Sequence, residues 1–161
     1  MTILGIDPGY AIVGYGLVSY DKYKFKSLGH GAITTKAGIP MNTRLLEVFN
    51  DMITILETFK PDCVAVEKLF FNSNTKTAID VAQARGVIIV ACASKNIPIY
   101  EYTPLQVKQS VTGYGRAEKA QVMEMTKSIL GLNSIPKPDD AADALAIAIC
   151  HGHCFNSNLM R

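Results

Sequence analysis

Four acidic residues stand where a carboxylate could take part in chemistry. Asp7 closes a short apolar stretch, residues 2–7, just before a Pro-Gly turn, and Glu67 follows a second such stretch, residues 63–66. In sheets covered by helices on both faces, sites gather beyond the carboxyl ends of strands. If these two strands are neighbours, the two carboxylates lie side by side. Taken singly, either acid would more often be solvated at a strand end.

A second pair of acids lies near the C-terminus. Asp140 and Asp143 stand three residues apart near the start of an apolar helical stretch, so they share one face. Acids are common in the first turn of a helix, which accounts for Asp139 and Asp140. That explanation does not cover Asp143, because alanine, leucine and isoleucine surround it and an unpaired charge there is costly. A bound cation would explain this carboxylate.

A cluster of carboxylates suits a hard divalent cation, since Mg²⁺ and Mn²⁺ prefer oxygen ligands. Two such ions roughly 3.5–4 Å apart would activate a water and stabilise the leaving oxygen in phosphodiester cleavage. Bare carboxylates would repel an anionic phosphate, and bound cations reverse that local sign. These acids therefore predict a magnesium-dependent centre with two ions, in which Mn²⁺ substitutes for Mg²⁺.

The apolar pattern predicts the elements that position these acids. Three strands are expected first, over residues 2–7, 13–20 and 23–35, with connections short enough for antiparallel hairpins. Helical spacing then predicts a helix over residues 41–60, capped by Asn42 or Thr43. Two more strands are expected at 63–66 and 97–102, and four more helices at 75–95, 103–111, 118–130 and 138–150.

This order predicts an α/β fold. Hairpins come first and later strands are joined through helices, so the five-stranded sheet is expected to be mixed. Three antiparallel strands would be followed by parallel strands, with helices on both faces. At 161 residues the chain is expected to be a single domain over residues 1–161.

Composition excludes several classes of protein. Hydrophobic residues make up 48% and charged residues 19%, which is typical of a globular chain and not of a disordered one. No apolar run reaches the roughly 20 residues of a membrane span, and the N-terminus lacks the basic start of a signal peptide. Four cysteines without an export signal are expected to be free thiols, and the protein is expected to be cytoplasmic.

The formal net charge of +2 looks unfavourable for nucleic-acid binding. Without the four site acids, however, ten acidic residues remain against sixteen basic ones, a net charge of +6. With cations at the acids, a DNA backbone would meet this basic excess, and its binding should weaken as salt rises. The average charge therefore combines a moderately basic surface with one concentrated acidic site.

Several short motifs, spread along nearly the whole chain, together match the pattern of a known protein family. They are Gly5-Ile-Asp7-Pro-Gly9 with Gly14-Tyr-Gly16, Ala65-Val-Glu67-Lys-Leu-Phe70, Gln83-Ala-Arg85-Gly86, Gln106-Val-Lys108, Gly113-Tyr-Gly115 with Ala117-Glu-Lys119, and Asp140-Ala-Ala-Asp143. Together, and in this order, they resemble the RuvC family of Holliday junction resolvases. The resemblance implies an RNase H-like fold and a structure-selective endodeoxyribonuclease. Such an enzyme resolves Holliday junctions by symmetric, metal-dependent nicking of two strands in recombination and repair.

The resemblance also implies roles for single residues. The four acids Asp7, Glu67, Asp140 and Asp143 match the family's catalytic, metal-binding carboxylates. Phe70 matches an aromatic residue that stacks on or unstacks bases at the junction centre, and stacking on an aromatic is worth roughly 1–3 kcal/mol per base.

The resemblance also implies roles for basic residues and identifies expected partners. Lys108 and Lys119 match family residues near the cleaved strand, although each alone would be an ordinary surface lysine. Lys76, Arg85 and Arg116 are further candidates for phosphate contacts. The helix over residues 75–95 matches the main homodimer contact. Four-way junction DNA is implied as the substrate, and branch-migration proteins of the RuvA and RuvB type as partners.

Three other functions would each explain part of this sequence. A nucleotide-binding ATPase of the actin and sugar-kinase type also has Asp followed by Gly at a hairpin, but it needs two lobes and a second phosphate motif. A non-catalytic or RNA-processing RNase H-like module would tolerate loss of acids, and all four are present. The Cys150-His-Gly-His-Cys154 run can hardly supply a zinc tetrahedron alone, so it is interpreted as the end of a helix with Cys150 buried.

Overall fold

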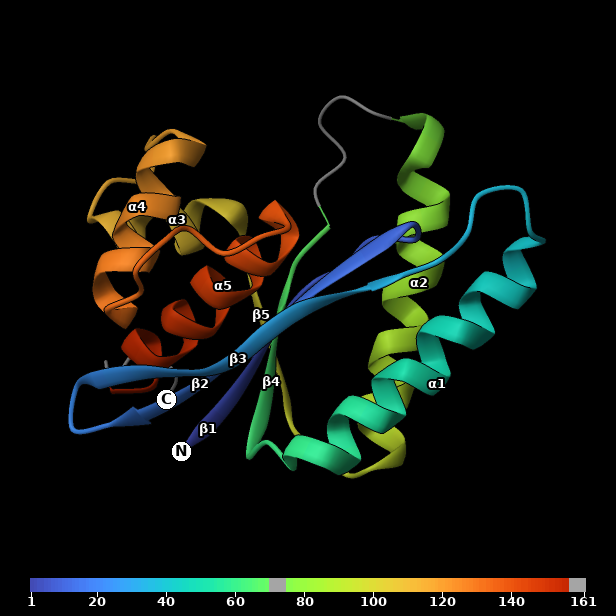
Figure 1. The fold of residues 1–161 in the computed structure, drawn as a ribbon, viewed down its shortest axis with the longest axis horizontal. Coiled ribbons are helices and arrows are strands. Elements are labelled where there is room, and N and C mark those ends of the chain that lie inside the picture. The colour runs from blue at the N-terminus through green and yellow to red at the C-terminus, as the bar shows by residue number, and fades with distance from the viewer. Residues whose placement is uncertain (70–74, 157–161) are drawn as a thin grey trace.

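The computed structural model describes residues 1–69 and 75–156, with side chains described for residues 77–155 of the second range. In chain order the elements are β1 (Thr2–Asp7), β2 (Ile12–Asp21), β3 (Lys24–Thr34), α1 (Met41–Phe59), β4 (Cys63–Glu67), α2 (Thr75–Ser94), β5 (Ile99–Tyr102), α3 (Pro104–Thr112), α4 (Lys119–Leu130) and α5 (Asp139–Asn156). Figure 1 shows a central twisted sheet with helices on both sides.

The sheet is mixed, as predicted. Its strand order is β3-β2-β1-β4-β5; β1 pairs antiparallel with β2 and β2 with β3, whereas β1 pairs parallel with β4 and β4 with β5. Helices α1 and α2 cover one face, and α3, α4 and α5 cover the other (Figure 1). The buried residues accordingly form two clusters, one on each side of the sheet.

Two predicted helix ends were wrong. Helix α1 is preceded by Pro40 as its N-cap, without a side-chain hydrogen bond, and Asn42 and Thr43 lie inside its first turn. Helix α5 continues past Cys150 to Asn156. Gly152 does not end it, because this glycine packs against the rings of Tyr20 and Phe25. Tertiary packing therefore overrides the low helix propensity of glycine here.

Helix α5 approaches the sheet more closely than side chains would allow. A Cβ added at Gly14 would lie 2.8 Å from Cβ of Asp140, and one added at Gly16 would lie 2.7 Å from Cγ of Leu145. A Cβ at Gly5 would lie 2.9 Å from the backbone nitrogen of Ala148. Contacts this short force a shift, so glycines in β1 and β2 leave the room in which α5 lies.

Helix α2 carries apolar residues on both its buried and its exposed faces. Ala84, Ile88, Ala91 and Cys92 are buried against the sheet and α1, whereas its Thr77–Ser94 stretch, with mean hydropathy 1.3, is only 22% buried. By length and composition this stretch could cross a membrane, contrary to the expectation that no segment could. Since one such helix is weak evidence for a span and its inner face is part of the core, we interpret α2 as a packed helix with an apolar outer face.

The glycine-lined contact yields the first prediction. Gly14→Ala should lower the free energy of unfolding by about 1–3 kcal/mol, because the added methyl must push the start of α5 away from β2. Chemical denaturation of both variants measures this. The matched control is Gly29→Ala in β3, where an added Cβ meets nothing within 4 Å; its stability should change by less than about 1 kcal/mol. Equal stability of the two variants would contradict this account of how α5 is positioned.

Candidate functional site

Asp7 and Glu67 lie next to each other at the ends of the two central parallel strands. The register of β1 and β4 runs to Ile6 opposite Val66, so the next residues on the two strands are the two acids. In the same register Gly5 lies opposite Ala65, which belongs to the buried cluster on the α5 side. Because side chains alternate along a strand, both acids point to that side as well. The expected pairing of these two carboxylates is thus confirmed.

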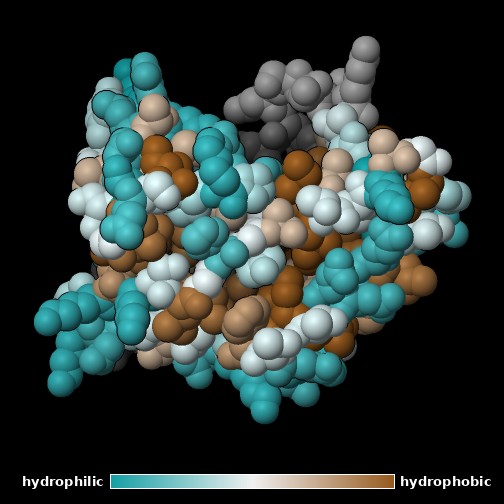
Figure 2. Space-filling model, in the orientation of Figure 1, coloured by the Kyte–Doolittle hydropathy of each residue, from teal (hydrophilic) through white to brown (hydrophobic). Residues whose placement is uncertain are grey.

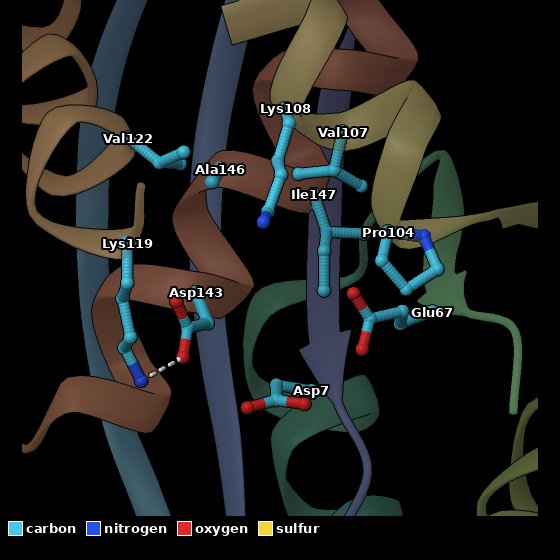
Figure 3. Close-up of a pocket in the computed structure, with 10 residues that line it drawn as sticks. All are labelled: Asp7, Glu67, Pro104, Val107, Lys108, Lys119, Val122, Asp143, Ala146 and Ile147. Carbon is cyan, nitrogen blue, oxygen red and sulfur yellow. Dashed lines mark ion pairs between the residues drawn. The ribbon is translucent and has the colours of Figure 1, made fainter. Parts of the chain in front are cut away.

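Asp143 joins the pair from helix α5. Figure 3 shows its carboxylate and those of Asp7 and Glu67 facing the same hollow, with the amines of Lys108 and Lys119 beside it. The hollow has a volume of about 290 Å³. Its lining residues are Asp7, Glu67, Pro104, Val107, Lys108, Lys119, Val122, Asp143, Ala146 and Ile147. Five elements therefore contribute to one pocket in which acids face lysines.

Asp140 lies near this pocket but does not line it. It is in the first turn of α5, where its backbone and Cβ pack over Gly14. Gly14 is the β2 residue directly opposite Asp7 in the sheet, and the negative charge of Asp140 contributes to the raised pKa of Asp7. The structure thus brings all four predicted acids into one region, with three in the pocket and Asp140 at its edge.

The acids destabilise one another's charged forms. Burial, followed by repulsion from Glu67, Asp143 and Asp140, raises the pKa of Asp7 from 3.8 to about 8. Burial and repulsion from Asp143 raise the pKa of Glu67 from 4.5 to about 7. Lys119 opposes both shifts, and Lys108 opposes the second. Groups with such shifts in a pocket mark functional sites, and a divalent cation would relieve the repulsion.

The two lysines reach the pocket from well-defined helix starts. Lys108 lies in α3, which begins with a capping box between Thr103 and Gln106. Lys119 is the first residue of α4, which begins with a capping box between Glu118 and Gln121. The Lys119 amine forms an ion pair with Asp143 at 2.9 Å (Figure 3), and this hydrogen bond raises the pKa of Lys119.

The pocket's carboxylates are the right kind of ligand for a hard cation, but their side chains are not yet positioned to share one. Every acidic group in the pocket offers carboxylate oxygens, which are the ligands that Mg²⁺ and Mn²⁺ prefer. Within residues 1–69 and 75–156, however, no three His, Cys, Asp or Glu side chains are grouped closely enough to hold an ion as they stand. A shared ion therefore requires side-chain rotation, above all of Asp143, which at present contacts Lys119.

The other predicted DNA contacts have different fates. Arg116 is exposed in the turn between α3 and α4. Phe70 and the side chain of Lys76 lie outside the described residues. Arg85 is half-buried: its Nε donates to the backbone oxygen of Glu67 at 3.3 Å, and its Nη2 forms an ion pair with Glu101. Sequence reasoning missed this contact, since nothing in the sequence shows that Arg85 faces these two groups.

The end of α5 holds a polar group in the core. Cys150 is buried, as predicted. His151 is fully buried as well, and its Nδ1 lies 2.7 Å from the hydroxyl oxygen of Tyr102. Burial lowers the pKa of His151 to about 4, so this imidazole is neutral at physiological pH. These contacts join α5 to β5 behind the pocket.

The fold and pocket together define an α/β domain with an acidic, cation-suited site at the ends of its central parallel strands. Comparison with known proteins narrows this class. The sequence profile of the family described as crossover junction endodeoxyribonuclease RuvC matches residues 3–151. The chain belongs to the RuvC family.

Two relatives from named organisms are similar in sequence to this chain along nearly its full length. The chain is 58% identical over 153 residues to the crossover junction endodeoxyribonuclease RuvC of Ruminiclostridium cellulolyticum, covering 95% of this chain and 92% of that protein. It is 59% identical over 153 residues to the protein of the same description from Clostridioides difficile, covering 95% and 90%.

Solved structures agree as well. RuvC of Thermus thermophilus superposes with a TM-score of 0.88 at 36% identity, covering 95% of this chain and 94% of that one. The same organism's RuvC in complex with Holliday junction substrate gives a TM-score of 0.89 at 33% identity, covering 98% and 97%. These likenesses confirm the predicted RNase H-like fold with its mixed sheet and two helical layers.

The raised pKa of Asp7 leads to a prediction about the pH dependence of stability. Because the folded state holds a proton on Asp7 more tightly than the unfolded state does, the stability of the wild-type protein should fall as pH rises from about 4 towards 8. Asp7→Asn removes this loss, so in a chelator its Tm should exceed that of wild type, by more at about pH 8 than at about pH 5. Each kcal/mol corresponds to about 2–4 °C for a chain of this size.

Thermal unfolding at the two pH values measures the effect. Asp51→Asn, which changes an exposed acid on α1, is the matched control and should leave Tm within about 2 °C of wild type at both pH values. If Asp7→Asn lowers Tm at about pH 8, the carboxylate stabilises the fold and the proposed repulsion is wrong.

Proposed function

We propose that this chain is a Holliday junction resolvase: a magnesium-dependent endodeoxyribonuclease that nicks two strands of a four-way DNA junction symmetrically during recombination and repair. The observation that carries the proposal is the pocket in which Asp7, Glu67 and Asp143 converge opposite Lys108 and Lys119. Membership of the RuvC family supports the substrate, since the Thermus thermophilus relative is found in complex with a Holliday junction.

Asp7, Glu67, Asp140 and Asp143 are proposed as the residues that hold the catalytic cations, two Mg²⁺ per site, with Mn²⁺ as a substitute. When bound, such ions supply an activated water and stabilise the leaving oxygen. The carboxylates contribute a dense negative charge, and burial together with their mutual repulsion already raises the pKa values of Asp7 and Glu67. Since a cation lowers these pKa values again, its binding and deprotonation of the acids favour each other.

The two lysines are proposed to handle the phosphate. Lys119 lies 2.9 Å from Asp143 and is 57% exposed, so its amine is free to turn from this carboxylate to a phosphate oxygen. Lys108 points into the same pocket from α3 (Figure 3). Two ammonium groups beside the scissile phosphate would orient it and offset its charge. Arg116, Lys76 and Phe70 are proposed as contacts further along the DNA, the two basic residues to phosphates and Phe70 to bases.

A homodimer is proposed through α2. Between α1 and α2 lies an apolar groove of about 500 Å³, lined by Leu45, Leu46, Phe49, Gln83, Gly86, Val87 and Val90. Ile79 and Val90 on α2 are 70% and 59% exposed, and Figure 2 shows apolar surface on the side of these two helices. Exposed apolar surface of this kind marks interfaces. Two-fold pairing would present two identical pockets to a junction, which gives symmetric cuts.

The proposal also covers domain organisation, localisation and protein partners. The sheet and its helices extend from Thr2 to Asn156, which supports one domain over residues 1–161. None of the four cysteines forms a disulfide and three of them are buried, as expected for a cytoplasmic protein. Branch-migration proteins of the RuvA and RuvB type are proposed as partners on family membership alone.

Asp7→Asn separates cutting from binding. This variant should lose cleavage of a synthetic four-way junction by more than about 100-fold, beyond the 10–100-fold that loss of a supporting residue costs. Junction affinity should stay within about threefold, because Asp7 is proposed to hold cations and not phosphate. Gel analysis of nicked product and fluorescence anisotropy measure the two properties. Loss of both together would contradict the proposed role of Asp7.

Val90→Asp tests the dimer. A charge in the centre of the apolar face should convert the protein to monomer at micromolar concentration, as measured by sedimentation velocity, because a buried unpaired carboxylate is costly. The control is Tyr23→Asp at the turn between β2 and β3, where Tyr23 is 78% exposed away from α1 and α2; it should remain dimeric. A dimeric Val90→Asp variant would place the interface elsewhere.

A further inference from the structure

Arg85 connects the helix proposed as the dimer contact with the strand that ends in a site acid. It lies in the middle of α2, yet its guanidinium reaches the end of β4, where Nε donates to the backbone oxygen of Glu67 at 3.3 Å. Its Nη2 pairs with the carboxylate of Glu101 on β5. One planar group thus contacts the last two strands of the sheet at the end of β4.

The contact replaces a backbone donor that the sheet does not supply at this point. The register between β1 and β4 ends with Ile6 opposite Val66. Two residues after Ile6, just beyond the end of β1, stands Pro8, which has no N–H to offer. On the other side, the backbone N–H of Lys68 donates to the oxygen of Tyr102 at 2.8 Å. Arg85 therefore satisfies the Glu67 carbonyl where the ladder with β1 stops.

Glu101 holds Arg85 in place from the edge strand. It lies opposite Val66 in the parallel register, and Val66 packs in the buried cluster on the α2 side of the sheet. Glu101 consequently points towards α2, whereas the side chain of Glu67 points to the opposite side, into the pocket. The Arg85 side chain is 17% exposed and that of Glu101 41%, so the pair is partly shielded from solvent.

We propose that Arg85 is a positioning residue: paired with Glu101, it fixes the backbone of Glu67 and so transmits the placement of the proposed dimer helix α2 to the cutting site. This inference rests on the proposed nuclease function. It gives Arg85 a different task from the phosphate contact that its charge suggests, because two of its donor nitrogens, Nε and Nη2, are already engaged by protein groups. Loosening a group that supports a metal ligand typically costs 10–100-fold in activity or metal affinity.

The test compares Arg85→Met and Glu101→Gln with wild type on a synthetic junction. Arg85→Met keeps the aliphatic stem but removes every donor. Positioning predicts a nicking rate at saturating junction that is lower by about tenfold or more and a higher Mg²⁺ concentration at half-maximal rate. Junction affinity and the slope of its logarithm against that of salt should remain as in wild type. A phosphate contact instead predicts weaker binding and a slope smaller by about 0.9.

For Glu101→Gln, the positioning role and the phosphate contact predict different changes in nicking rate and junction affinity. If Arg85 positions Glu67, the weakened pair should slow nicking and leave junction binding unchanged. If Arg85 binds phosphate, release from the competing carboxylate should tighten junction binding, which would overturn the proposal. Unchanged nicking in both variants would overturn it too.

Two controls distinguish a specific role of Arg85 from a general loosening of α2 and from failure of the proposed nuclease function. Lys95→Gln removes the ion pair between Lys95 and Glu57, 2.6 Å apart, at the far end of α2, and it should nick at the wild-type rate. Equal slowing by Lys95→Gln would mean that any loosened α2 slows nicking, which overturns a specific role for Arg85. Absence of nicking by wild type would refute the proposed function itself, independently of Arg85.

Discussion

Helix α5 can reach the sheet only because glycines in β1 and β2 leave no side chain in its way. The rest of the site depends on this close approach. With α5 in place, Asp143 faces the ends of β1 and β4 and Asp140 lies over Gly14, opposite Asp7. A larger residue at Gly14 or Gly16 would separate the α5 acids from the strand acids. The spacing of the carboxylates is thus set by backbone packing more than by the acids themselves.

This packing forces like charges together at a cost in stability. Burial and mutual repulsion push the pKa values of Asp7 and Glu67 towards neutrality, and Lys119 and Lys108 at the pocket oppose the shifts. Proteins keep such arrangements where function requires them. The Lys119–Asp143 pair offsets part of the repulsion, and cations would offset more. In the proposed function the same lysine would serve either the acid or a phosphate, which would link release of Asp143 to arrival of substrate.

Much of this arrangement could be predicted from sequence, because local signals were consistent. Apolar runs and turn residues gave all five strands, and the Thr103-Pro104 start of α3 is confirmed by its capping box. Acids at strand ends and Asp143 among apolar residues indicated the site. The extension of α5 to Asn156 and the Arg85–Glu101 contact could not be predicted, because both depend on residues far apart in the chain. The glycines did carry a signal, since glycine inside a strand often marks close backbone approach.

The central claim is that two identical carboxylate pockets in one dimer cut a four-way junction in a metal-dependent way. Mapping the cut positions on all four strands of a synthetic junction, with Mg²⁺ and with a chelator, tests it most directly. Nicks are expected at symmetry-related positions in two opposing strands with Mg²⁺, and none in chelator. Cuts at unrelated positions, cuts in chelator or an intact junction with Mg²⁺ would contradict it.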